Sequence, residues 1–314
     1  MVKLNIKLPN HFLDEEVRND YVVTSDMKKV WAIELDLLNE LLRVCKKNNI
    51  KIFASGGTML GAVRHNGFIP WDDDIDMMMF REDYNKLCQI AENEFKHPYF
   101  FQTEWTDRGS LRGHAQLRNS ETTGILKNEL DFNYTFNQGI FIDIFPLDTV
   151  IDNERLFKKQ FKKVQKYKKR YRRLSEISDR YKNCSNNKIK HFIKTIISVT
   201  FGEMIKKQKK PIYDFYYKKY EDECQRYNYK NNTKYISTLS FMFDNEQHFK
   251  YRSDYENLID MDFEFIKIPI GANYDHALTK RYGNYKLFEK GTSYHGGIIF
   301  DVDKPYTEYL EKNK

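Results

Sequence analysis

The residues best suited to chemistry lie in one stretch, SGGTMLGAVRHNGFIPWDDDIDMMMF, which spans residues 55–80. Residues 72–76 carry four carboxylates in five positions. Because side chains alternate along a strand, an extended segment here places Asp72, Asp74 and Asp76 on one face. Carboxylates this close disfavour one another's ionised form unless a cation compensates them. Mg²⁺ prefers such oxygens and keeps positions open for phosphate, so the run predicts a Mg²⁺ site, with Mn²⁺ as the alternative ion.

The competing interpretation of the acidic run is a solvated, inert turn. The run leads directly into the apolar residues 77–80, which a solvated turn does not require. We therefore favour the metal site, followed by a buried strand over residues 74–80.

A separate acid, Asp143, lies in the apolar segment NQGIFIDIFPLD, residues 137–148. An ionised carboxylate in a buried strand is costly unless it is paired or metal-bound. We therefore expect Asp143 to be the third ligand of a metal held by Asp74 and Asp76, in preference to a structural acid bonded to backbone. Asp148 follows the predicted strand and is expected in a loop.

Gly56 and Gly57 follow a predicted strand over residues 51–54 and precede a predicted helix that begins at Thr58. Glycines allow the backbone to approach a ligand closely, and a helix N-terminus directs N–H groups and a positive dipole to the same place. This combination predicts a phosphate cradle. Arg64 lies between the glycines and the acids, where its planar guanidinium suits either a phosphate or an ion pair with the acidic run.

The elements that must position these residues alternate between helix and strand over roughly residues 26–150. Apolar spacing predicts helices at 26–49 and 81–95, and strands at 51–54, 74–80, 114–118 and 139–145. This order indicates the α/β (α+β) class. Strand-like segments resume after residue 235, followed by a helix near 273–282.

Composition places the chain among globular proteins, since 40% of its 314 residues are hydrophobic and 15% are aromatic. Its net charge of +7 is concentrated in residues 155–182, which alone carry a net charge of +11. This basic segment favours an anionic partner, either a membrane surface or a nucleic acid, although charge runs are commonly just solvated faces. Residues 151–230 read as three helices. The second, near residues 188–208, fits a membrane interface and a core helix equally well.

The four cysteines, Cys45, Cys88, Cys184 and Cys224, are widely spaced, so no disulfide framework or zinc site is predicted. We expect no signal peptide and no spanning helix, because no run of about 18 apolar residues occurs. A cytoplasmic protein, with peripheral attachment to the inner face of the membrane as the variant, is the expectation.

Three blocks of sequence resemble the LicD family of phosphocholine and phosphoalditol transferases related to fukutin. They are GGTMLGAVRHNGFIPWDDDID, NQGIFIDIFPLD and IPIGANYDHALTKRYGNY; in the third, Gly271 or Ala272 stands where the family usually has proline. The resemblance covers roughly 27–148 and 235–305 and implies a nucleotidyltransferase fold, a mixed sheet with flanking helices. We therefore expect a catalytic core over 1–150 and a part completing the catalytic domain over 235–314. Between them, residues 151–234 form a basic helical insertion that the resemblance does not explain.

The resemblance also implies a Mg²⁺-dependent transfer of phosphocholine from CDP-choline to a hydroxyl of a cell-surface glycan, such as a teichoic acid, lipopolysaccharide or capsule precursor, with release of CMP. In this interpretation Asp74, Asp76 and Asp143 form the catalytic metal site. The donor phosphates would face Gly56, Gly57, Thr58, Arg64 and Arg118, the last in HAQLRNSETTG. Tyrosine and tryptophan rings would surround the quaternary ammonium group.

Other functions remain open at this point. The donor could instead be CDP-ribitol, CDP-glycerol or another CDP-alditol, and nucleotidyl transfer with release of pyrophosphate is more distant. A catalytically inactive protein that binds a membrane or a nucleic acid through the basic helices belongs to a different class. Intact Asp74, Asp76 and Asp143 argue against it, and nucleic acid is the less favoured partner. In the enzyme interpretation, a lipid-linked acceptor would explain a basic segment that contacts an anionic membrane.

Overall fold

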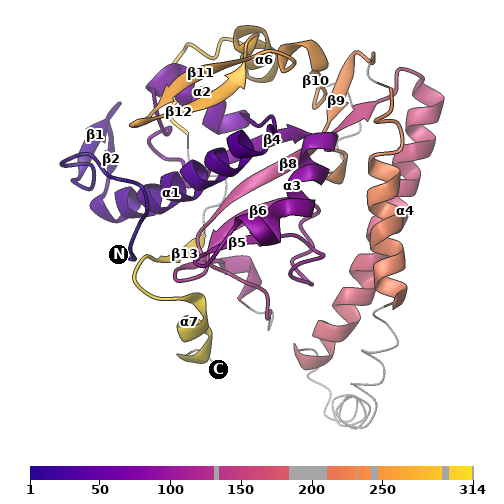
Figure 1. The fold of residues 1–314 in the computed structure, drawn as a ribbon, viewed down its shortest axis with the longest axis horizontal. Coiled ribbons are helices and arrows are strands. Elements are labelled where there is room, and N and C mark those ends of the chain that lie inside the picture. Colours follow the sequence, from indigo (N-terminus) through magenta and orange to yellow (C-terminus); the bar gives the residue numbers. More distant parts are fainter. Residues whose placement is uncertain (131–133, 184–210, 231, 242–246, 292–296, 313–314) are drawn as a thin grey trace.

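The structure is a computed structural model that describes the chain except for residues 131–133, 184–210, 231, 242–246, 292–296 and 313–314. Its centre is a seven-stranded mixed sheet (Figure 1). The strand order is β10 (Lys250–Tyr251), β9 (Tyr235–Ser237), β8 (Phe141–Val150), β4 (Asp76–Phe80) and β3 (Phe53–Ala54), with β6 (Ala115–Asn119) and β5 (Tyr99–Gln102) joined to β8. The predicted α/β class is confirmed.

Strand β8 organises the sheet, and all ten of its residues are buried. Its first part pairs antiparallel with β6, and its last part pairs antiparallel with β9. Along its other edge it pairs parallel with β4, in a register that aligns Asp143 with Asp76. Side chains of aligned residues in neighbouring strands lie on the same face of the sheet, so this register brings the two predicted acids together.

Helix α1 (Ser25–Lys47) lies across β6 and β8 (Figure 1). Thr24 caps it, because its hydroxyl accepts a hydrogen bond from the backbone N–H of Met27 at 3.2 Å. The helix buries Trp31, Leu38 and many other apolar side chains in the main core. Helix α3 (Arg81–Glu94) also contacts β4 and β8. The predicted helices at 26–49 and 81–95 therefore occur with ends shifted by one or two residues.

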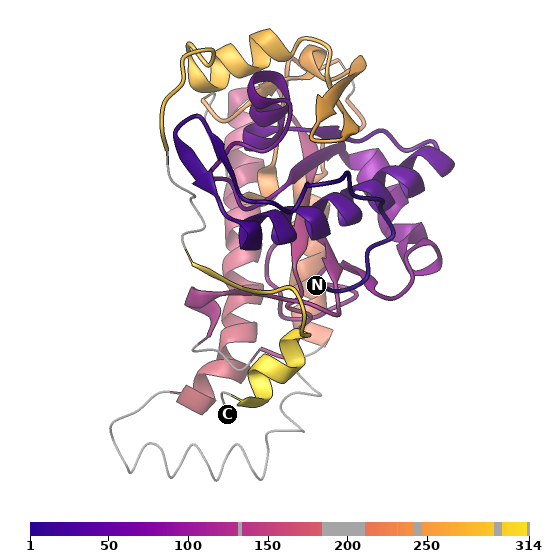
Figure 2. The same ribbon diagram turned by 90° about the vertical axis from the view of Figure 1, so that its left-hand side faces the viewer.

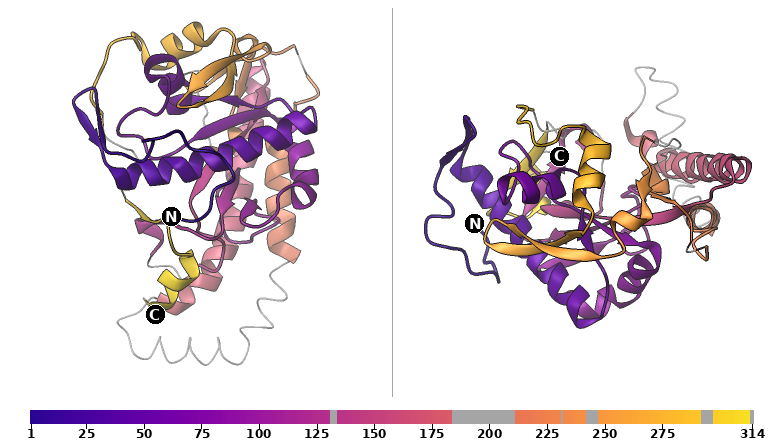
Figure 3. Two further views of the ribbon diagram at one scale, coloured as in Figure 1. Left: turned by 60° about the vertical axis from the view of Figure 1, so that its left-hand side comes forward. Right: turned by 90° about the horizontal axis from the view of Figure 1, so that it is seen from above.

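The segment that runs from residue 258 to residue 282 gathers around helix α2 (Gly56–His65) (Figures 2 and 3). A hairpin of β11 (Leu258–Phe263) and β12 (Ile266–Gly271) contacts α2 and β3, and α6 (Tyr274–Tyr282) follows it. Farther along, β13 (Ile298–Asp301) pairs with β7 (Thr123–Leu126), and α7 (Tyr306–Lys312) contacts β7. The remaining short elements are β1 (Glu16–Arg18), β2 (Tyr21–Val23), η1 (Lys127–Glu129), η2 (Leu239–Phe241) and η3 (Arg252–Asp254).

The basic segment forms α4 (Glu154–Asn183), which stands beside the helical residues 211–224 at one edge of the molecule (Figures 1 and 3). A second hydrophobic cluster joins these two helices. Its largest members are Phe157, Phe161, Tyr171, Tyr213, Tyr217 and Tyr220. Over residues 154–174 the apolar face of α4 is thus covered by protein, whereas its outer face is cationic. The predicted second helix, near 188–208, lies outside the described residues.

The sequence predicts Asp148 in a loop, and this prediction is wrong. It lies in β8, is fully buried and accepts two hydrogen bonds of 2.7 Å from the guanidinium of Arg81. Burial alone would lower the pKa of Arg81, but the charge and hydrogen bonds of Asp148 outweigh it and raise the pKa. This pair links α3 to the central strand. Within the described parts of the chain, no helix combines the length and apolarity needed to cross a membrane.

Candidate active site

The double glycine lies at the start of α2, immediately after β3. Gly56 adopts φ +59°, a left-handed conformation that favours glycine. A Cβ atom on Gly57 would lie 2.7 Å from Oδ2 of Asp72, and one on Gly56 would lie 3.3 Å from Oδ2 of Asp76. The absence of side chains at these positions therefore allows two carboxylates to approach the N-terminus of α2, where the helix dipole favours negative charge.

The acidic run is a loop followed by a strand, since β4 begins only at Asp76. The predicted alternation along a strand is therefore wrong for residues 72–75. One carboxylate oxygen from each of Asp72, Asp73 and Asp74 lies within 4.8 Å of the others. The indole N–H of Trp31 donates to the carbonyl of Asp72 at 3.0 Å and holds this loop against α1. Such a group of oxygens fits a hard divalent cation such as Mg²⁺ or Mn²⁺.

Asp76 is fixed from two directions. Its backbone N–H donates to the hydroxyl of Thr58 at 2.8 Å, and its carbonyl accepts from the N–H of Ser55 at 3.2 Å. Its Cα partner in β8 is Asp143, whose own N–H donates to the carbonyl of Ile75 at 2.9 Å. Buried Thr58 therefore positions a predicted metal ligand. Its contact with a donor phosphate stays a prediction.

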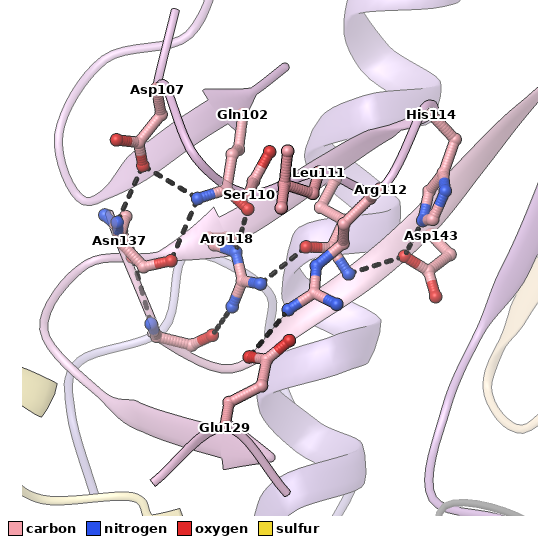
Figure 4. Close-up of polar contacts among 12 residues, drawn as sticks. Gln102, Asp107, Ser110, Leu111, Arg112, His114, Arg118, Glu129, Asn137 and Asp143 are labelled. Carbon is pink, nitrogen blue, oxygen red and sulfur yellow. Dashed lines mark hydrogen bonds and ion pairs between the residues drawn. The ribbon is translucent and has the colours of Figure 1, made fainter. Parts of the chain in front are cut away.

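Asp143 is held by two side chains from the neighbouring segment of the chain (Figure 4). The ring Nε2 of His114 lies 2.9 Å from Oδ1 of Asp143, and the amide of Gln116 donates to the same oxygen at 2.7 Å. Burial would raise the pKa of Asp143, but the charge of His114 and these hydrogen bonds outweigh it and lower the pKa. Asp143 is therefore kept ionised, as a metal ligand must be.

Arg118 is predicted to contact a donor phosphate, but its side chain is buried and its guanidinium donates to other protein groups (Figure 4). It donates to Oε1 of Gln102 at 2.6 Å, to the carbonyl of Gly139 at 2.7 Å and to Oε1 of Gln116. Burial lowers the pKa of Arg118 to about 9. Gln116 in turn donates to Asp143, so Arg118 positions Asp143 indirectly, through Gln116.

Arg64 also differs from the prediction. It lies at the C-terminal end of α2, away from the double glycine. Its guanidinium donates to the carbonyls of Tyr285 and Leu287, at 3.1 and 3.2 Å, and to His65 at 3.0 Å. In the described structure these contacts join α2 to the C-terminal segment. A contact of Arg64 with a donor phosphate stays a prediction.

A pocket of about 190 Å³ opens beside Asp76 and Gly56. Lys250, Lys280 and Arg281 bring positive charge to its wall. Aromatic side chains supply much of the rest, namely Phe145, Phe241, Phe249, Tyr251 and Tyr255. Sequence reasoning missed all of these, because they come from β8, β10, α6 and three short connecting segments.

Lys250 lies in a perturbed electrostatic environment in this pocket. Burial lowers the pKa of Lys250 to about 8; nearby Arg281 and Lys280 act in the same direction, and Asp76 opposes them. A lysine with this pKa carries its charge at neutral pH while being held close to a carboxylate and two other cations. An anionic ligand in the pocket would relieve the repulsion among the cations.

Comparisons with known proteins agree with this geometry. Residues 49–180 match the family model described as LicD/FKTN/FKRP, nucleotidyltransferase domain. The chain is 25% identical over 258 residues to the lipopolysaccharide cholinephosphotransferase LicD of Haemophilus influenzae, covering 80% of this chain and 88% of that protein. It is 48% identical over 93 residues to protein RP689 of Rickettsia prowazekii (30% and 31%), and 35% identical over 51 residues to the human ribitol 5-phosphate transferase FKRP (16% and 10%).

Proposed function

We propose, from the match to the LicD family model over residues 49–180 and the similarity to a cholinephosphotransferase, that the chain is a Mg²⁺-dependent phosphotransferase that moves phosphocholine from CDP-choline to a hydroxyl of a cell-surface glycan, with release of CMP. The observation that carries the proposal is the pairing of Asp76 with Asp143 on adjacent strands, next to the double glycine and the cationic pocket. This arrangement joins ligands for a divalent cation to a space for a phosphorylated donor.

The chemistry requires positioning and charge neutralisation. The acceptor oxygen bonds to the phosphorus that carries choline, the bond from that phosphorus to the CMP oxygen breaks, and the net reaction releases CMP and a proton. A bound Mg²⁺ would neutralise the pyrophosphate charge. Asp74, Asp76 and Asp143 would hold it, the N–H groups at Gly56 and Gly57 would face the phosphates, and Lys250 would balance the remaining charge.

The aromatic wall of the pocket supports choline as the donor's alcohol. Phe145 and Phe241 pack edge to face with centroids 5.1 Å apart, and both line the pocket. The faces of such rings attract a quaternary ammonium group, by roughly 0.5–2 kcal/mol for each ring. A phosphoalditol offers hydroxyls in place of that cation and would gain little from the same rings.

A donor panel tests the proposal. Binding of CDP-choline, CDP-ribitol and CDP-glycerol is measured by calorimetry in Mg²⁺, and CMP release is followed with a set of glycosides as acceptors. We expect CDP-choline to bind best. The variant Phe241→Leu should weaken CDP-choline by about 2- to 30-fold and leave CDP-glycerol unchanged, because it removes only the cation–π contact. If CDP-ribitol or CDP-glycerol bound best, the protein would instead be a phosphoalditol transferase. Release of pyrophosphate from CTP would indicate nucleotidyl transfer.

We also propose that the outer face of α4 contacts an anionic membrane surface, where a lipid-linked acceptor would be found. In residues 154–174, the part of α4 whose side chains the structure describes, nine lysine and arginine side chains are exposed: Arg155, Lys158, Lys159, Lys162, Lys166, Lys169, Arg170, Arg172 and Arg173. Over the same residues the apolar face is already covered by the second hydrophobic cluster, so charge supports this contact more than insertion does. The role of an inactive binding protein is less well supported, since the pocket and the acids stand together in one site.

A further inference from the structure

Helix α1 carries a carboxylate for which no role has yet been given. Glu34 is 1% exposed, and its Oε2 has no hydrogen-bond partner among the described residues. A buried charged oxygen without a partner is costly, and native structures seldom leave one without a reason. Its helix is otherwise a core element, with Ile33 and Leu35 fully buried on either side in sequence.

Glu34 faces the acidic loop. Trp31 lies three residues earlier on the same side of α1, and its indole donates to the carbonyl of Asp72. Burial raises the pKa of Glu34 well above the usual range, and the charges of Asp74, Asp73, Asp72 and Asp143 act in the same direction. These four aspartates are therefore near enough for their charges to act on Glu34.

Another buried acid of α1 provides a comparison. Asp36 is also buried, but its carboxylate accepts hydrogen bonds from the N–H groups of Asn5 and Ile6, at 2.8 and 2.7 Å, and from the hydroxyl of Tyr99 at 2.7 Å. Asp36 is thus satisfied by protein alone. Glu34 lies two residues away on another face of the same helix, and its Oε2 has no hydrogen-bond partner among the described residues.

We propose that Glu34, together with Asp72, Asp73 and Asp74, binds a second divalent cation on the α1 side of the acidic loop. The carboxylate oxygens of the three aspartates already lie within 4.8 Å of one another. A proton on Glu34 would neutralise that residue only, whereas a divalent ion neutralises several of the four acids and gives the orphan oxygen a partner. Asp74 is also a proposed ligand of the ion at Asp76 and Asp143, so the two sites would share this residue.

The inference deepens the proposed function, but its test does not depend on turnover or on the donor. Binding of MnCl₂ to the full-length protein is counted by electron paramagnetic resonance of free Mn²⁺. We expect two ions per wild-type chain. The variant Glu34→Gln keeps the shape of the side chain and should bind one ion. The variant Asp76→Asn should also lose one ion while retaining the site at Glu34. The control Asp36→Asn should still bind two.

Thermal unfolding gives a second measurement. Addition of Mn²⁺ should raise the melting temperature of wild type and of Asp36→Asn more than that of Glu34→Gln, because an ion that binds only the folded state stabilises it. Equal stoichiometry and equal stabilisation in wild type and Glu34→Gln would overturn the second site and indicate a protonated Glu34. If Asp76→Asn alone kept both ions, the metal site of the proposed function would fail while the site at Glu34 stood.

Discussion

The acidic loop at residues 72–74 and the outer face of α4 both concentrate charge of one sign, but the structure treats them differently. The loop lies between α1 and α2, and Asp73 within it is buried. Specific groups fix its surroundings, such as the indole of Trp31 on the carbonyl of Asp72. The described side chains of the α4 face extend into solvent, and one of them, Lys158, pairs with Glu154 one turn away.

This difference indicates two kinds of recognition. Buried like charges need a defined counter-ion at a defined place, because the low dielectric inside a protein strengthens the repulsion between them. Exposed like charges repel weakly in water and attract any sufficiently anionic surface, so their number matters more than their geometry. Substitutions should therefore have large effects at the acidic site and small, graded effects on α4.

The largest effect is expected for Asp143→Asn. It preserves the shape of the side chain but removes the charge that His114 and Gln116 hold in place. Loss of a metal ligand should lower kcat by at least about 10³-fold, equivalent to several kcal/mol of transition-state stabilisation. CMP release measures this, and circular dichroism checks that the fold is kept. Activity near the wild-type level would show that this acid is not a ligand.

The next effect concerns the core that carries the acidic site. Arg81→Met leaves Asp148 buried without its ion-pair partner, and we expect a loss of roughly 3–5 kcal/mol in the free energy of unfolding. Urea denaturation measures it. The double variant Arg81→Met/Asp148→Leu should recover part of the loss because no charge remains buried. A single variant as stable as wild type would show that the pair does not hold α3 to β8.

Lys250 should give an intermediate effect that depends on pH. Its pKa of about 8 means that it is charged at pH 7 and mostly neutral at pH 9, so the Kd for CDP-choline should rise by about tenfold over that range. Lys250→Arg should remove this pH dependence, since arginine stays charged. Lys250→Met should show the weaker Kd at every pH. Calorimetric titrations of CDP-choline in Mg²⁺ at pH 7, 8 and 9 measure these Kd values. If the Kd of Lys250→Arg rose with pH as steeply as that of wild type, a group other than Lys250 would be responsible.

The smallest effect is expected on α4. Lys162 is exposed there, and Lys162→Gln should reduce binding to vesicles of phosphatidylglycerol and phosphatidylcholine by about fivefold at low salt. Lys96→Gln, at an exposed position near the end of α3, is the matched control and should change little. Co-sedimentation measures both. Equal losses in the two variants would remove the special role of the α4 face. Deleting residues 155–205 would be a poor alternative, because α4 also buries Phe161 and Tyr171.

Much of the fold could be predicted from local patterns. The helix over 26–49 and the strands near 51–54, 114–118 and 139–145 all occur, since hydrophobic periodicity reflects which face an element buries. Asp148 shows the limit of such reasoning. It lies beyond the predicted strand and is expected in a loop, yet it belongs to β8, where Arg81 of α3 neutralises its charge.

The candidate site also has some features that the sequence predicts and others that only the tertiary structure shows. The residue types in the stretch 55–80, and the isolated acid at 143, define a divalent-cation and phosphate chemistry, because that chemistry depends on oxygen ligands and flexible backbone that the amino acids themselves provide. Only the tertiary structure decided that Arg118 supports Gln116 and does not touch the pocket, that Lys250 lines it, and that Glu34 faces the loop. These residues are far apart in the chain, and the packing of α1 and β10 around β8 and β4, which no local pattern encodes, determines which side chains share one space.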